Sequence, residues 1–175
     1  MKRTIFVVSM FFVSIAMMAQ GTVITKYMNQ YADNDKVTKI SVSQKMFSLF
    51  TNLEAGSAAE KEFLQTVSKL KGLKVLMADS LPNSAELYKQ AVADVNKAGY
   101  EELVSVYDAR GNMLFSVKES NGVISELIMV GGEKKQFIMI SLWGVIDLKN
   151  ISKIAQQMRV PGLDQLKHID DGNQK

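Results

Sequence analysis

From residue 100 onward, apolar and polar side chains alternate with a period of two residues, a pattern that restricts the fold more than any other feature of the sequence. Four β-like runs follow one another, and each connection between them contains glycine: Arg110-Gly111-Asn112, Asn121-Gly122 and Gly131-Gly132. Asn-Gly in particular favours a two-residue hairpin turn. Because such short connections join antiparallel neighbours, the pattern predicts a four-strand antiparallel meander.

The last of these runs, QFIMISLWGVI at residues 136–146, is apolar on both of its faces. A strand without a polar face is usually covered on both sides. We therefore expect this strand at the centre of the sheet, unless its second face is an interface. One face carries Phe137, Met139 and Trp143, and the other carries Ile138, Ile140 and Leu142.

Before residue 100, helical and strand-like patterns alternate. The half-polar segment VTKISVS predicts a short edge strand over residues 37–43, and the apolar run LKVLMAD predicts a buried strand over residues 73–79. Apolar residues recur at helical spacing in four segments, within residues 23–31, 46–53, 63–70 and 87–95.

Helix start and stop signals flank two of these segments. Ser57 and Glu60 form a capping-box pattern, in which the serine oxygen accepts from an exposed amide while the glutamate reaches back. Asn83 and Glu86 repeat the start signal in weaker form. Gly72 is placed to end the first of these two helices.

A final helix is predicted after Asp147, and Pro161-Gly162 ends it. The order of elements predicts an α+β fold with a single mixed, largely antiparallel sheet and helices packed on it. We expect one domain over residues 20–162, followed by a polar, frayed tail over residues 163–175. The apolar residues of the final helix are Leu148, Ile151, Ile154, Ala155 and Met158.

The first 19 residues have the pattern of a cleavable Sec-type signal peptide. Lys2 and Arg3 precede an apolar run of 14 residues, which is shorter than the roughly 20 that a bilayer-spanning helix needs. Ala19 closes the run, so we expect cleavage between Ala19 and Gln20; an uncleaved membrane anchor is the alternative. The chain has no cysteine, which excludes a lipid-modified cysteine at the cleavage site. The sequence thus predicts a periplasmic or secreted protein that is not a lipoprotein.

Removal of residues 1–19 takes away two basic side chains, so that Lys plus Arg falls from 21 to 19 against 18 acidic residues. A nearly neutral mature chain offers no electrostatic case for binding nucleic acid or an anionic membrane surface. No later apolar stretch approaches spanning length, so we expect no transmembrane span after cleavage.

The residues that usually carry chemistry are few. Without cysteine and with only His168 in the polar tail, no Ser-His-Asp or Cys-His arrangement and no zinc ligand set can be built. Asp33 and Asp35 superficially resemble a calcium loop but lack its glycine and distal glutamate, so a loop-and-cap role is favoured. Gly131-Gly132 lies between two strands, unlike a phosphate-binding loop. We therefore predict no catalytic, cofactor-binding or metal-binding residue, and expect no enzyme.

Several segments together resemble a known family: TVITKYMNQYAD, QKMFSLF, KLKGLKVLMAD, AGYEELVSVYDARG and FIMISLWGVIDLKNISKIA. They are similar to an uncharacterised secreted family found mainly in Bacteroidota, the domain-of-unknown-function family numbered 4252. The resemblance covers roughly residues 22–158. It implies secretion and a single α+β domain, and it carries no catalytic residue over to this chain.

Three functions remain open on these observations. The leading hypothesis is a non-enzymatic periplasmic binding or interaction domain, linked to envelope signalling or stress. It would bind an envelope or periplasmic protein partner through the free edge of residues 37–43 or through the helix around Phe47 and Phe50. The alternatives are a carboxylate-based hydrolase of envelope glycans, with a pair such as Glu102 and Glu126, and a carrier of a small apolar ligand.

Overall fold

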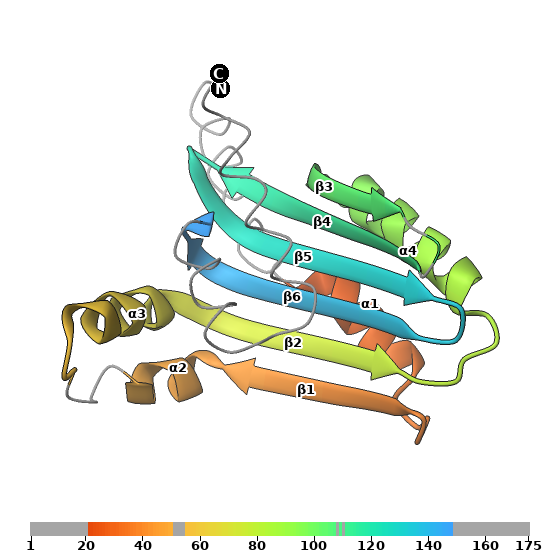
Figure 1. Cartoon of the computed structure of the whole chain (residues 1–175), viewed down its shortest axis with the longest axis horizontal. Coiled ribbons are helices and arrows are strands. Elements are labelled where there is room, and N and C mark those ends of the chain that lie inside the picture. Colours follow the sequence, from red (N-terminus) through yellow and green to blue (C-terminus); the bar gives the residue numbers. More distant parts are fainter. Residues whose placement is uncertain (1–20, 51–54, 108, 110, 149–175) are drawn as a thin grey trace, which may run out of the picture.

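The computed structural model describes residues 21–50, 55–107, 109 and 111–148. The predicted signal peptide, its cleavage residues Ala19 and Gln20, the tail and His168 lie outside these residues. The described elements are α1 (Thr22–Gln30), β1 (Val37–Ser43), α2 (Gln44–Phe50), α3 (Ala58–Ser68), β2 (Leu70–Ala78), α4 (Ser84–Lys97), β3 (Glu101–Tyr107), β4 (Gly111–Ser120), β5 (Val123–Glu133) and β6 (Phe137–Ile146) (Figure 1).

The six described strands form one sheet in the order β1-β2-β6-β5-β4-β3. Every pairing between neighbours is antiparallel. After β2, the connection through α4 leads to β3 at the far edge, and the predicted meander then returns until β6 lies beside β2 (Figure 1). The α+β fold and the central place of the last strand are thus confirmed, and β1 and β3 are the two edges.

Two of the predicted glycine connections have different outcomes. Asn121 and Gly122 have φ angles of 54° and 75°, as a two-residue hairpin turn with two left-handed residues requires. In contrast, Gly131 and Gly132 lie inside β5, so their prediction as a turn was wrong. The close packing of α4 explains why this strand position holds glycine: a Cβ at position 132 would stand 2.6 Å from Cβ of Tyr88.

Helices α1 and α4 cover one face of the sheet and lie behind it in Figure 1. Their buried residues include Ile24 and Tyr27 from α1 and Leu87, Ala91 and Val95 from α4. These side chains form one core cluster with residues from β2, β4, β5 and β6. The apolar spacing that predicted both helices therefore marks the sides that pack on the sheet.

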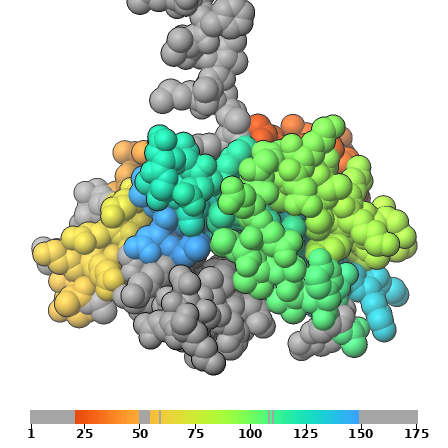
Figure 2. All heavy atoms as spheres, turned by 90° about the horizontal axis from the view of Figure 1, so that it is seen from above, coloured from red at the N-terminus to blue at the C-terminus, as the bar shows by residue number. Residues whose placement is uncertain are grey.

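The opposite face carries a second cluster, which includes Phe115, Met129 and Ile146 from the sheet and Phe47 and Val67 from the helices. Helices α2 and α3 lie at one end of the sheet, and Figure 2 shows α3 and α4 at opposite ends of the molecule. Three residues of β6 on this face are only partly buried. They are Ile138, Ile140 and Leu142.

The local helix signals are largely confirmed. The Ser57 hydroxyl accepts from the Glu60 backbone N–H at 3.2 Å, and the Glu60 carboxylate accepts from the Ser57 N–H at 3.0 Å. At Asn83 no side-chain cap forms, and the hydroxyl of the next residue, Ser84, donates to the Glu133 carbonyl at 2.7 Å instead. Gly72 does not end α3, which already ends at Ser68. It belongs to β2, so the predicted stop was wrong.

Candidate functional site

The two edge strands differ in how they are protected against further pairing. Edge strands are commonly blocked by charged side chains, bulges or proline. The β3 edge begins with the exposed residues Glu101 and Glu102 and has a register irregularity between Glu102 and Val104. The β1 strand pairs with β2 in continuous register over all its residues and contains no proline. Among the described strands, none pairs with the outer side of β1 (Figure 1).

The single charged residue of β1 is directed back into the molecule. Lys39 Nζ donates to the Tyr31 carbonyl at 2.7 Å and also to the Ala32 carbonyl, next to the C-terminal end of α1. Lysine at an edge normally discourages pairing because its charge would have to be desolvated. The ammonium group of Lys39 is bound by these two carbonyls. Lys39 therefore protects the outer edge of β1 against strand pairing less than a lysine with a free side chain would.

Exposed apolar side chains gather in the segment formed by β1 and α2. Ile40 is 42% exposed, Met46 48% and Leu49 51%. Large exposed apolar residues elsewhere among the described residues, such as Val123 and Val145, are separate from this segment. We call the outer edge of β1 together with Ile40, Met46 and Leu49 the β1 surface.

Of the two aromatic residues proposed as an interaction surface, the structure describes the side chain of Phe47 alone. Phe47 is only 8% exposed and belongs to the second core cluster. The side chain of Phe50 lies outside the described part of the chain. The exposed apolar residues of α2 are instead Met46 and Leu49, which lie on either side of Phe47 in the sequence. The helical period places neighbours of a buried residue on another side of the helix, which is the signal that could have identified them.

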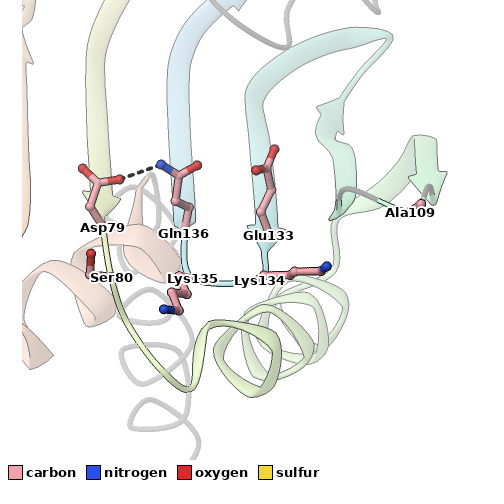
Figure 3. Close-up of a pocket in the computed structure, with 7 residues that line it drawn as sticks. All are labelled: Asp79, Ser80, Ala109, Glu133, Lys134, Lys135 and Gln136. Atoms are coloured by element: carbon pink, nitrogen blue, oxygen red, sulfur yellow. Dashed lines mark hydrogen bonds between the residues drawn. The ribbon is translucent and has the colours of Figure 1, made fainter.

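A hollow of about 710 Å³ lies where β2 and β5 end and β6 begins, close to the β5–β6 turn. In Figure 3, Asp79, Gln136 and Glu133 stand side by side at these strand ends, with Lys134 and Lys135 on the turn below. Gln136 Nε2 donates to Asp79 Oδ1 at 3.0 Å. All of these side chains are exposed, so the hollow has the polar, solvated lining of a strand-end surface. Its remaining lining residues are Ser80 and Ala109.

A second hollow of about 440 Å³ adjoins the first through Ser80 and contains Asp33 and Asp35. Between them, Asn34 Oδ1 accepts from the Lys36 backbone N–H at 2.9 Å, an Asx-type turn that fits the predicted loop role. Within the described residues, no group of three or more histidine, aspartate or glutamate side chains is arranged to hold a metal ion. None of the described helices is long and apolar enough to cross a membrane.

The hydrolase hypothesis named Glu102 and Glu126, and neither lines the two hollows described above. Glu102 is exposed on β3 and accepts from Ser105 Oγ at 2.6 Å. Glu126 is fully buried on β5. An acid and a base for glycan hydrolysis must flank the same bond, which a buried and an exposed carboxylate on separate strands do not achieve here.

The surroundings of Glu126 are unusual. Both of its carboxylate oxygens accept from the Gly21 backbone N–H, at 3.2 and 3.1 Å, and Ser141 Oγ donates to one of them at 2.6 Å. Burial, followed by the neighbouring Glu126 carboxylate, raises the pKa of Tyr100 far above its ordinary value. The sequence carried one signal for this burial: Glu126 is in phase with Ile128 and Val130, which both belong to the first core cluster.

A protein-family model described as "Domain of unknown function (DUF4252)" matches residues 30–154, well over half of the chain. The chain belongs to this family. The resemblance found in the sequence is thereby confirmed at the level of the family. The match includes all the described strands and helices α2, α3 and α4, and it begins at the last residue of α1. Comparisons with curated proteins and with solved structures gave no match.

Proposed function

We propose that this DUF4252 domain is a non-enzymatic interaction module that binds an extended segment of a partner protein along β1. The observation that carries the proposal is the edge of β1: it is regular, it has no described neighbour on its outer side, and its only charged side chain is bound internally. A peptide that adds to such an edge gains main-chain hydrogen bonds, and its alternate side chains gain contacts with neighbouring apolar residues.

The exposed apolar residues indicate what the partner segment would contain. Ile40 lies on β1, while Met46 and Leu49 lie on the helix that follows directly. The flexible methionine side chain adapts to different apolar partners at low cost. We therefore expect an extended partner segment with apolar residues at every second position. The predicted signal peptide places this partner in the periplasm or the envelope, where the domain would serve a signalling or stress response.

Two matched variants test the proposal. Ile40→Lys introduces a charge on β1, and Val123→Lys introduces the same charge at the start of β5; both wild-type side chains are 42% exposed. We expect Ile40→Lys to weaken partner binding at least tenfold, and Val123→Lys to leave it within about twofold, because a single well-placed charge discourages strand pairing. The partner is first identified in intact cells by a photocrosslinking residue at Thr38, and circular dichroism checks the fold of each variant.

The binding mode has its own readout. Strand addition along β1 should protect alternate amides of residues 37–43 from hydrogen exchange in the complex, since only every second amide points outward. Equal loss of binding by both lysine variants would contradict the proposal, as would unchanged exchange along β1 in the complex. Crosslinks that join β1 only to a second copy of the chain would show self-association instead. A strictly monomeric protein that gives no crosslink at Thr38 would also contradict the proposal.

A further inference from the structure

The outer edge of β1 presents a regular row of main-chain groups. Just before the strand, the Lys36 carbonyl accepts from the Asp79 N–H at 3.4 Å. Hydrogen bonding alternates along an antiparallel strand, so the even-numbered residues of β1 direct their main-chain groups toward β2 and the odd-numbered residues direct theirs outward. The Val37 N–H donates to the Asn34 carbonyl at 3.1 Å. The outward groups of residues 39, 41 and 43 meet no described strand.

A second copy of β1 in antiparallel orientation fits this edge when the pairing is centred on Ile40. Val37 then lies opposite Ser43 of the second copy and Lys39 opposite Ser41, so that every residue of β1 is paired. Odd-numbered residues meet odd-numbered residues, and their outward main-chain groups therefore face each other. A shift by one residue would set outward groups against inward ones, and a shift by two would leave the strand ends unpaired.

The side chains are compatible in the same register. Ile40 meets Ile40 of the second copy, and it is exposed on the face where Val42 packs against the second core cluster. Pairs of β-branched residues directly opposite each other stabilise antiparallel strands. On the other face Lys39 lies opposite Ser41, while its Nζ stays bound to the Tyr31 carbonyl. The register therefore sets no two lysine residues directly opposite each other.

The charges that flank β1 are complementary in this register as well. Asp35 precedes Ile40 by as many positions as Lys45 follows it, and both side chains are exposed. Among the described residues, the one salt bridge within 4 Å joins Lys26 and Asp94, so neither flanking charge belongs to an ion pair there. A twofold axis at Ile40 brings Lys45 of each copy next to Asp35 of the other, and this attraction occurs twice in the dimer.

We propose that two copies of this chain pair antiparallel along β1, about a twofold axis at Ile40, and form one continuous sheet. Helix α2 packs against β2 and α3, so it leaves the outer edge of β1 clear for a second strand (Figure 1). Twofold contacts of this kind are the commonest in homo-oligomers. The dimer goes beyond the proposed partner binding and does not depend on it. Because both use the same edge, a dimer and a bound partner segment exclude each other.

Single cysteine variants test the register directly, since the chain contains no cysteine. Residues of an antiparallel pair that share no hydrogen bond have Cα atoms about 4.5 Å apart, within the range that a disulfide spans. Ile40→Cys should therefore form a covalent dimer in oxidised glutathione. Thr38→Cys should not, because the two copies of residue 38 lie about 13 Å apart along the strands, whereas a mixture of Thr38→Cys and Val42→Cys should form the mixed dimer. Crosslinking of Ile40→Cys and Thr38→Cys to the same extent, or of neither, would overturn the proposal.

Charge reversal tests the flanking ion pairs in the mature chain without added cysteine. Lys45→Glu and Asp35→Lys should each raise the dissociation constant of the dimer about tenfold, because symmetry turns both attractions into repulsions. The double variant should return to within about threefold of the wild type, since opposite charges meet again. Lys89→Glu makes the same change at an exposed position of α4 and should leave the constant unchanged. Sedimentation velocity over a dilution series measures the constant, and a double variant without recovery would contradict the ion pairs.

The outcomes for the dimer and for the proposed function are distinguishable. A wild-type chain that stays monomeric up to its solubility limit would overturn the dimer, whereas crosslinks from Thr38 to another protein would still support partner binding. A chain that dimerises and crosslinks only to its own copy would support the dimer and contradict the proposed partner. Circular dichroism of each variant shows whether a loss of dimer reflects a loss of fold.

Discussion

Gly72 of β2 lies directly beneath the indole ring of Trp143 of β6. The two residues are cross-strand partners, and a Cβ atom at position 72 would stand 2.0 Å from Cζ2 of Trp143. No pair of non-bonded carbon atoms in a folded protein tolerates this distance, so the ring occupies the space that any other residue would need. The glycine is required by packing between two strands, and it has no role in ending α3.

We expect Gly72→Ala to destabilise the domain by about 1–3 kcal/mol, the usual cost of forcing extra atoms into a packed site. The measurement is the free energy of unfolding in urea. In a Trp143→Leu background the same substitution should cost less than about 1 kcal/mol, because the smaller side chain leaves room for a methyl group. An equal cost in both backgrounds would show that the indole is not the cause.

Gly132→Ala should likewise lower the free energy of unfolding, again by about 1–3 kcal/mol. The added methyl group would stand 2.6 Å from Cβ of Tyr88, so α4 would have to move away from β5. Gly122→Ala is the comparison, because a Cβ there meets no atom within 4 Å and only the positive φ of 75° opposes it. Near-ultraviolet circular dichroism should change for Gly132→Ala and stay the same for Gly122→Ala, since only the first displaces an aromatic side chain.

Asp94 links α1 to α4 and should make stability depend on acidity. Its Oδ2 accepts from Lys26 Nζ at 2.7 Å and from the Tyr27 hydroxyl at 2.6 Å, and these contacts hold the pKa of Asp94 below its ordinary value. A lowered folded pKa stabilises the fold fully above the unfolded value of about 3.9. The contribution is lost as the pH falls from there through the folded pKa.

Asp94→Asn should therefore cost about 1 kcal/mol at neutral pH, a modest value because Lys26 is half exposed. The difference between wild type and variant should disappear at low pH, as measured by urea unfolding across an acid series. Asp79→Asn is a suitable control because Asp79 is exposed and its described partner is the neutral side chain of Gln136. A difference that persists unchanged at the lowest pH would rule out this carboxylate as its origin.

The end of the chain offers a further prediction. Leu148 has helical backbone and packs against the second cluster, while the rest of the helix predicted after Asp147 lies outside the described residues. We expect that helix to pack on the partly buried residues Ile138, Ile140 and Leu142, because its own apolar residues recur at helical spacing. A chain that ends at Leu148 should bind the dye ANS more strongly than the full mature chain. A chain that ends at Gly162 should behave like the full chain, since it lacks only the polar tail; equal dye binding by all three would contradict the prediction.

The sequence alone determined the features that depend on neighbours a few positions apart. The period-two runs predicted the meander, Asn121-Gly122 predicted its tight turn, and the spacing of Ser57 and Glu60 predicted a capping box. The edge position of residues 37–43 also followed, because a half-polar strand cannot be covered on both faces. Each of these signals is local, so a linear pattern contains all the information that it needs.

Only the tertiary structure decided the roles that depend on distant partners. In the sequence, Gly72 and Gly132 look like cap or turn residues. In the fold both lie in strands, where the Trp143 ring packs against the first and α4 packs against the second, so that neither position has room for a side chain. Phe47 is buried, while Met46 and Leu49 beside it remain exposed. The contact between Gly21 and Glu126 joins residues 105 positions apart. Such contacts arise from the packing of whole elements, and no short window of sequence contains both partners.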